Sequence, residues 1–96
     1  MTIKKSETNE GIVLLPEGWL DTQSAPELKA VVDGLDENIP VVLDLKALEY
    51  ISSAGLRQIV ATHKKVNGKL TLRNVNPDIM DIFKMAGFDK RLHIES

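Results

Sequence analysis

The spacing of apolar residues along the chain changes repeatedly between the period of a strand and that of a helix. Alternating or continuous apolar runs predict strands, which lie at residues 3–8, 11–15, 41–45, 69–73 and 92–94. Apolar positions three and four residues apart predict helices that begin near Ser24, Ser53 and Pro77. Strands that alternate with helices favour an α/β sheet with parallel neighbours, and a hairpin at Asn9-Glu10 makes that sheet mixed.

Polar residues, Gly and Pro mark where these elements begin and end. The run Ser24 to Glu27 resembles a capping box with Pro in the first turn, and Asn67-Gly68 is expected to stop the second helix near residue 66. Asn76 is predicted to cap the third helix, with Gly87 just past its end. Pro16 is expected to end the second strand or to place it at a sheet edge.

The most informative segment lies where the strand at 41–45 gives way to the second helix. Ser52, Ser53 and Gly55 stand at the predicted helix start, where backbone N–H groups lack partners within the helix. A serine hydroxyl can accept from one of these groups, and most serines at such positions are only caps. The same N–H groups and the helix dipole also favour a bound phosphate. Because Gly is unfavourable within a helix, Gly55 indicates close approach by another element or by a partner.

Three sequence blocks, in order and at matching spacing, resemble the STAS domain family of bacterial anti-sigma factor antagonists and sulfate-transporter tails. They are Gly18-Trp19-Leu20-Asp21 with Ala25-Pro26-Glu27-Leu28; Asp44-Leu45 with Leu48 and Tyr50-Ile51-Ser52-Ser53-Ala54-Gly55-Leu56; and Ile82-Phe83-Lys84-Met85-Ala86-Gly87-Phe88. The resemblance implies a single domain over residues 1–96. It implies a mixed β-sheet of four to five strands with helices packed mainly on one face.

The resemblance also implies partner switching controlled by phosphorylation. Ser53 matches the family's acceptor serine, and Ser52 is the less favoured alternative. Ser52 stands where the family has Asp, and Ala54 stands where it has a second hydroxyl. The implied partners are an anti-sigma factor with serine/threonine kinase activity and a phosphoserine phosphatase. The residues expected to bind the partner are Asp21, Ser52, Ala54, Gly55, Leu56 and Arg57.

Composition narrows the remaining classes of function. A net charge of −2 gives no support for nucleic-acid binding, and the absence of Cys excludes disulfides and thiolate metal sites. No metal-ligand spacing, phosphate-binding glycine loop or nucleophile elbow occurs, so we expect no enzymatic activity and no cofactor. Residues 1–5 lead into polar residues and no apolar run is long enough to span a bilayer, which predicts a cytoplasmic protein. We expect a monomer or a weak dimer.

Charge is unevenly distributed, because the segment from Tyr50 to Pro77 contains basic residues and no acid. This pattern fits either a solvated helix face or a surface for an acidic partner, with Arg57 the strongest candidate for the latter.

Two other functions remain open for a STAS domain. One is an adaptor or scaffold that is never phosphorylated, within a transport or stress-sensing assembly, which the missing Asp favours. The other is a module that binds a small ligand.

Overall fold

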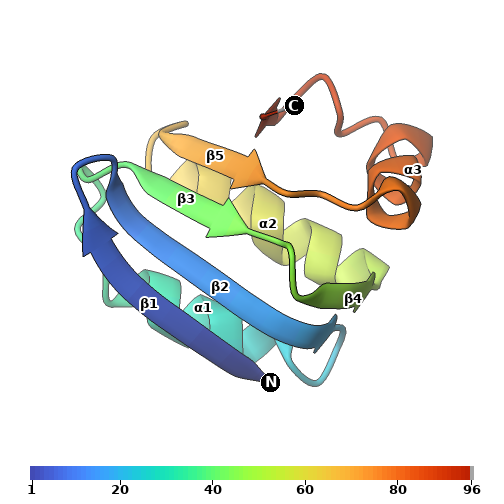
Figure 1. Cartoon of the computed structure of the whole chain (residues 1–96), viewed down its shortest axis with the longest axis horizontal. Coiled ribbons are helices and arrows are strands. Elements are labelled where there is room, and N and C mark those ends of the chain that lie inside the picture. The colour runs from blue at the N-terminus through green and yellow to red at the C-terminus, as the bar shows by residue number, and fades with distance from the viewer. Residues whose placement is uncertain (96) are drawn as a thin grey trace.

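The computed structural model describes residues 1–95 and consists of a twisted sheet with three helices (Figure 1). The strands are β1 (Thr2–Thr8), β2 (Gly11–Leu20), β3 (Val41–Asp44), β4 (Leu48–Ile51), β5 (Leu70–Arg73) and β6 (His93–Ile94). The helices are α1 (Ala25–Asp33), α2 (Ser53–Lys65) and α3 (Pro77–Met85). The predicted elements occur in the predicted order, with β4 as an additional strand that the sequence analysis did not predict.

The sheet is mixed, as the sequence predicts. Its main path runs β1-β2-β3-β5-β6, and β4 pairs with β2 outside that path. The hairpin of β1 and β2 is antiparallel, whereas β2–β3, β2–β4, β3–β5 and β5–β6 are parallel. Residues 1–95 thus contain six strands rather than the four to five expected, because Leu48–Ile51 forms a strand instead of a loop.

The prediction for Pro16 is wrong, because β2 continues through this residue to Leu20 as an internal strand. Its pairing explains how Pro is accommodated there. On the side opposite β1, β3 pairs with residues 12–14 and β4 pairs with residues 18–20. Pro16 lies between these two ladders, where a residue without an N–H group interrupts no pairing on that side. β4 therefore extends the line of β3 along the outer half of β2.

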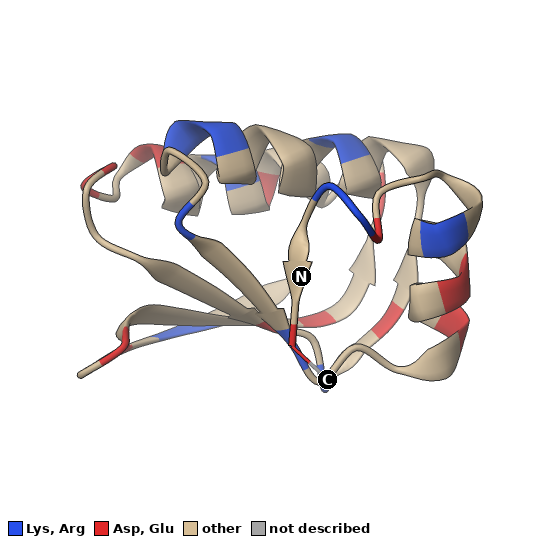
Figure 2. Ribbon diagram, turned by 90° about the horizontal axis from the view of Figure 1, so that it is seen from above, with Lys and Arg blue, Asp and Glu red and all other residues tan. Residues whose placement is uncertain are grey.

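The core lies between the sheet and the two helices α1 and α2, which cover one face (Figures 1 and 2). α3 stands at the end of the sheet, where it contacts β4. The fully buried side chains come from the sheet and from all three helices and include Leu14, Leu28, Leu43, Ile59 and Phe83. Within residues 1–95, none of the helices has the length and apolar character needed to cross a membrane.

The local signals at three helix boundaries act as the sequence predicts. Asn67 and Gly68 adopt positive φ angles of 56° and 80° directly after α2, which turns the chain toward β5. The Asn76 side chain accepts a hydrogen bond of 2.9 Å from the N–H of Ile79 and caps α3. Gly87 follows the end of α3 with φ +77°.

Candidate functional site

The two serines at the start of α2, Ser52 and Ser53, have different structural environments. Ser52 is the N-cap residue, and its hydroxyl accepts the N–H of Gly55 at 3.3 Å, while its carbonyl accepts the N–H of Leu56 at 2.9 Å. Ser53 is the first residue of the helix and is exposed. No hydrogen bond of the Ser53 hydroxyl occurs within the described part of the chain. The predicted serine cap is confirmed, and because Ser52 provides it, the Ser53 hydroxyl is not needed to cap the helix.

Gly55 is needed because the end of β2 approaches α2 very closely. A Cβ atom at this position would stand 2.5 Å from the carbonyl oxygen of Leu20 and 2.8 Å from Cγ1 of Ile51. The same Leu20 carbonyl accepts the N–H of Ser52 at 2.9 Å. Close approach by another element, which the sequence indicated, is therefore present and involves β2. It fixes the start of α2 against the sheet.

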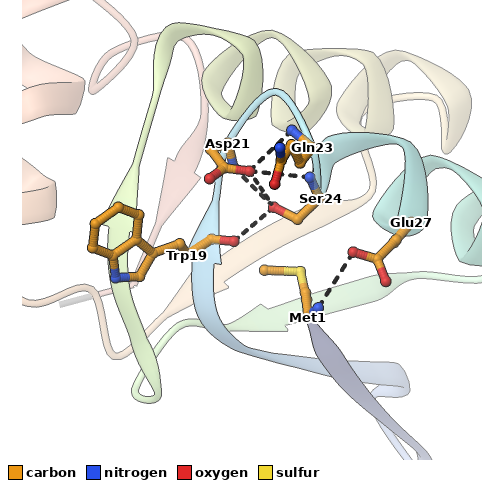
Figure 3. A network of polar contacts seen from close by, with 6 residues as sticks. All are labelled: Met1, Trp19, Asp21, Gln23, Ser24 and Glu27. Atoms are coloured by element: carbon orange, nitrogen blue, oxygen red, sulfur yellow. Dashed lines mark hydrogen bonds and ion pairs between the residues drawn. The ribbon is translucent and has the colours of Figure 1, made fainter.

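The turn from β2 to α1 lies beside this contact and holds a compact polar network (Figure 3). The Ser24 hydroxyl donates to the carbonyl of Trp19 at 2.6 Å and accepts the N–H of Asp21 at 2.9 Å. The Asp21 carboxylate accepts the N–H groups of Ser24 and Gln23 at 3.1 and 3.0 Å. These hydrogen bonds, the one from the Ser24 N–H above all, hold the pKa of Asp21 below its ordinary value.

The capping box predicted for α1 is wrong. Ser24 is the N-cap residue, but its side chain accepts no hydrogen bond from the helix, because the hydroxyl is engaged with β2 and Asp21. The Glu27 carboxylate does not return to Ser24 and instead pairs with the amino group of Met1 at 3.3 Å (Figure 3). The strand end, rather than the helix, determines where the Ser24 hydroxyl points.

The residues expected to bind a partner fall into two groups by exposure. Gly55 and Leu56 are buried, with Leu56 7% exposed, so they pack inside the protein and are not accessible to a partner. Ser52 and Ala54 are half-buried, and Arg57 is exposed one turn beyond Ser53. Asp21 is also half-buried, and its hydrogen bonds remain inside its own turn. Ser52, Ala54 and Arg57 are thus accessible close to Ser53 in the chain, while Gly55 and Leu56 are buried.

A groove runs from Arg57 along α2 toward the segment that follows α3. It has a volume of about 340 Å³ and is lined by Arg57, Val60, Ala61, Lys64, Phe88 and Arg91. The Arg91 guanidinium carbon lies 5.5 Å from the centre of the Phe88 ring. The groove is therefore lined by both basic and apolar side chains, and Arg57 and Lys64 come from the acid-free segment between Tyr50 and Pro77.

Sequence reasoning missed an aromatic pair at the same end of the sheet. Trp19 and Tyr50 are register partners on β2 and β4, and their ring centres are 5.1 Å apart. Each ring stands one residue before an aliphatic core residue and two before a polar residue of the site, Asp21 or Ser52. This repeated order of aromatic, aliphatic and polar residues was the available signal, but its meaning depends on the pairing of β4 with β2.

Among residues 1–95, no three His, Cys, Asp or Glu side chains are grouped so that they could hold a metal ion.

The comparison with family models matches the STAS domain over residues 3–96. A curated relative from Bordetella bronchiseptica, named "Putative anti-sigma factor antagonist BtrV", is 42% identical over 69 residues. That match covers 69% of this chain and 58% of the relative, so the chain spans less than two thirds of the relative's length.

Solved structures share the fold at lower sequence identity. An anti-sigma factor antagonist from Mycobacterium paratuberculosis superposes with a TM-score of 0.86 at 24% identity, covering 97% of this chain and 83% of that one. The Bacillus cell fate determinant SpoIIAA in its phosphorylated form has a TM-score of 0.70 at 15% identity, covering 99% of this chain and 92% of that one. The mixed sheet with three helices is therefore the architecture of these proteins.

Proposed function

Because the chain belongs to the STAS domain family, we propose that it is an anti-sigma factor antagonist whose binding is switched off by phosphorylation of Ser53. The relative from Bordetella bronchiseptica and the structure from Mycobacterium paratuberculosis carry the name anti-sigma factor antagonist, and SpoIIAA was solved in a phosphorylated form. The unphosphorylated protein binds an anti-sigma factor that is also a serine kinase, which releases the sigma factor. The kinase then phosphorylates Ser53, and a phosphatase reverses the modification.

The single observation that carries this proposal is the difference between the two adjacent serines. The Ser52 hydroxyl holds the N–H of Gly55, whereas Ser53 is exposed and heads the helix. A kinase can therefore modify Ser53 without removing the cap from α2. A phosphate on Ser53 also lies near the positive end of the α2 dipole, which favours negative charge.

The same phosphate opposes binding of the partner. It adds about −1.5 to −2 charges at the exposed start of the helix. Burying such a charge in an interface without a matching cation costs several kcal/mol, far more than the roughly 0.3–1 kcal/mol gained from the helix dipole. Loss of affinity with retention of the fold is the expected result. Arg57, one turn away, partly offsets the added charge.

Phosphorylation is tested by incubating the protein with its purified anti-sigma kinase, ATP and Mg²⁺ and mapping the product by mass spectrometry. We expect one phosphate on Ser53 in the parent and in Ser52→Ala, and none in Ser53→Ala, which still binds the kinase. Phosphate on Ser52 alone would reject this assignment. No phosphate, despite tight binding of the kinase, would favour the adaptor function, which the absence of the family's Asp also supports.

The switch itself is tested by calorimetric titration of Ser53→Asp with the same kinase, together with thermal melts. We expect Ser53→Asp to melt like the parent and to bind much more weakly. The double variant Ser53→Asp/Arg57→Ala should bind more weakly still. A folded Ser53→Asp protein that binds as tightly as the parent would show that charge at this position is not the switch.

A further inference from the structure

Two of the large apolar side chains that remain exposed stand together beside the start of α2. Trp19 is 59% exposed and Tyr50 is 43% exposed, and their rings tilt by 50° at a separation of 5.1 Å. Figure 3 shows the Trp19 ring pointing away from α1 and from Ser24. The other two exposed apolar residues, Ile39 and Met85, belong to the α1–β3 connection and to α3. The aromatic pair is thus a distinct surface feature at the end of β2 and β4.

Stabilisation of the ladder does not by itself account for this pair. Cross-strand aromatic contacts do support short ladders, and β2–β4 contains only three register pairs. Trp19 nevertheless remains 59% exposed to solvent, and Tyr50 remains 43% exposed. Trp and Tyr are enriched at protein interfaces and among the residues that dominate binding energy. An exposed pair of these residues is therefore a candidate anchor for a partner.

The position of Ser53 identifies which partner covers the pair. Ser53 lies three positions after Tyr50, and an extended chain of that length spans at most about 11 Å. A specific protein interface buries roughly 800 Å² on each partner, which corresponds to a disc of about 16 Å radius. An interface centred on the Ser53 hydroxyl is therefore large enough to include Tyr50, with Trp19 beside it.

We propose that Trp19 and Tyr50 anchor the anti-sigma kinase that modifies Ser53, by entering an apolar pocket on its surface. This inference rests on the proposed function, because the footprint is that of a protein acting on Ser53.

The parent protein provides a direct test, because Trp19 is its only tryptophan. The probe is the purified anti-sigma kinase, with any tryptophan of its own replaced by Phe. We expect binding to move the Trp19 emission to shorter wavelength and to lower its quenching by acrylamide at least twofold. A complex that forms by calorimetry, yet leaves the emission and the quenching of Trp19 unchanged, would overturn the proposal.

Variants then measure how much of the affinity the pair provides. We expect Trp19→Ala to weaken kinase binding at least about thirty-fold and Tyr50→Ala at least about tenfold, as for residues that dominate an interface. Met85→Ala removes an exposed apolar side chain from α3 and serves as the matched control, with a change below about twofold. Circular dichroism and melts identify any variant that fails to fold, and the fluorescence test of the parent does not depend on them.

The outcomes separate this inference from the proposed function. If the kinase binds the parent and both folded aromatic variants equally, the anchor is wrong while the switch at Ser53 stands. If the kinase binds the parent through Trp19 and Tyr50 but never phosphorylates Ser53, the anchor stands and the switch fails. If the kinase does not bind the parent at all, both fail.

Discussion

The starts of α1 and α2 lie side by side at one end of the sheet, and each contains serine at its N-cap position. Ser24, before α1, is 6% exposed, and its hydroxyl bonds both to the carbonyl of Trp19 and to the N–H of Asp21. Ser52, before α2, caps its helix through Gly55 and is followed by the exposed Ser53. Consecutive carbonyls of β2, those of Trp19 and Leu20, hold the two helix starts in place.

The difference shows that position at a helix start does not by itself make a serine available for modification. Adding a phosphate to Ser24 would require the loss of a buried hydrogen bond to a strand. At the start of α2, Ser52 provides the helix cap, so the exposed hydroxyl of Ser53 is accessible to another protein. Buried and committed hydroxyls belong to the fold, whereas an exposed and uncommitted one can serve regulation.

The largest effect is expected when the committed serine is removed. Ser24→Ala leaves the carbonyl of Trp19 and the N–H of Asp21 without their partner in a part-buried turn. Unsatisfied groups of this kind cost about 1–3 kcal/mol each, so we expect the free energy of unfolding to fall by about 2 kcal/mol. Urea denaturation followed by circular dichroism measures this change.

Ser53→Ala is the matched control for that experiment. It removes the same hydroxyl from an exposed position, and its stability should stay within about 0.5 kcal/mol of the parent. If Ser53→Ala destabilised the protein as much as Ser24→Ala does, the contrast between a structural and an available serine would be wrong.

A smaller effect is expected at the conventional cap. Ser52→Ala removes the acceptor for the N–H of Gly55, and the loss of an N-cap costs about 1 kcal/mol. Ser52→Asp introduces another good cap residue and should leave the stability near that of the parent. The same urea titrations compare the two variants. Equal losses in both would indicate that packing around Ser52, and not capping, stabilises the helix start.

The smallest effect concerns the charge of Asp21. Because folding lowers the pKa of this carboxyl, its contribution is present above its unfolded pKa, roughly 3.9, and disappears as pH falls through the folded pKa. Asp21→Asn retains a side-chain oxygen acceptor but does not titrate. We therefore expect the stability advantage of the parent over Asp21→Asn to be constant from roughly pH 5 to 7 and to shrink below about pH 4. Thermal melts across this range measure it, and an advantage that grows toward low pH would contradict it.

Sequence reasoning succeeded where local chemistry determines the structure. The serine cap at the start of α2, the stop at Asn67-Gly68 and the cap at Asn76 depend on residues within one helical turn. All are confirmed, with Ser52 rather than Ser53 as the capping serine. The tight contact at Gly55 was also indicated, because Gly inside a helix requires a reason. The three sequence blocks located the family and the mixed sheet.

It failed where structure depends on residues far apart in the chain. The extension of β2 through Pro16 and the strand β4 exist because residues 18–20 pair with residues 48–51. The hydroxyl of Ser24 leaves its helix because this extension brings the Trp19 carbonyl within 2.6 Å. The exposed aromatic pair follows from the same pairing. A strand of four residues and the extension of another strand beyond a proline give little local signal for these features.

The contacts of the Trp19 and Leu20 carbonyls also suggest an order in which parts of the domain fold. The contact of Trp19 with Ser24 closes a loop of five residues, whereas the contact of Leu20 with Ser52 joins positions 32 residues apart. Loop-closure entropy makes the shorter contact the earlier one, and the longer one waits until β3 and β4 have paired with β2. We therefore expect the start of α2 to form late during folding. A partner that recognises Ser53 in this setting also distinguishes a finished molecule from a nascent one.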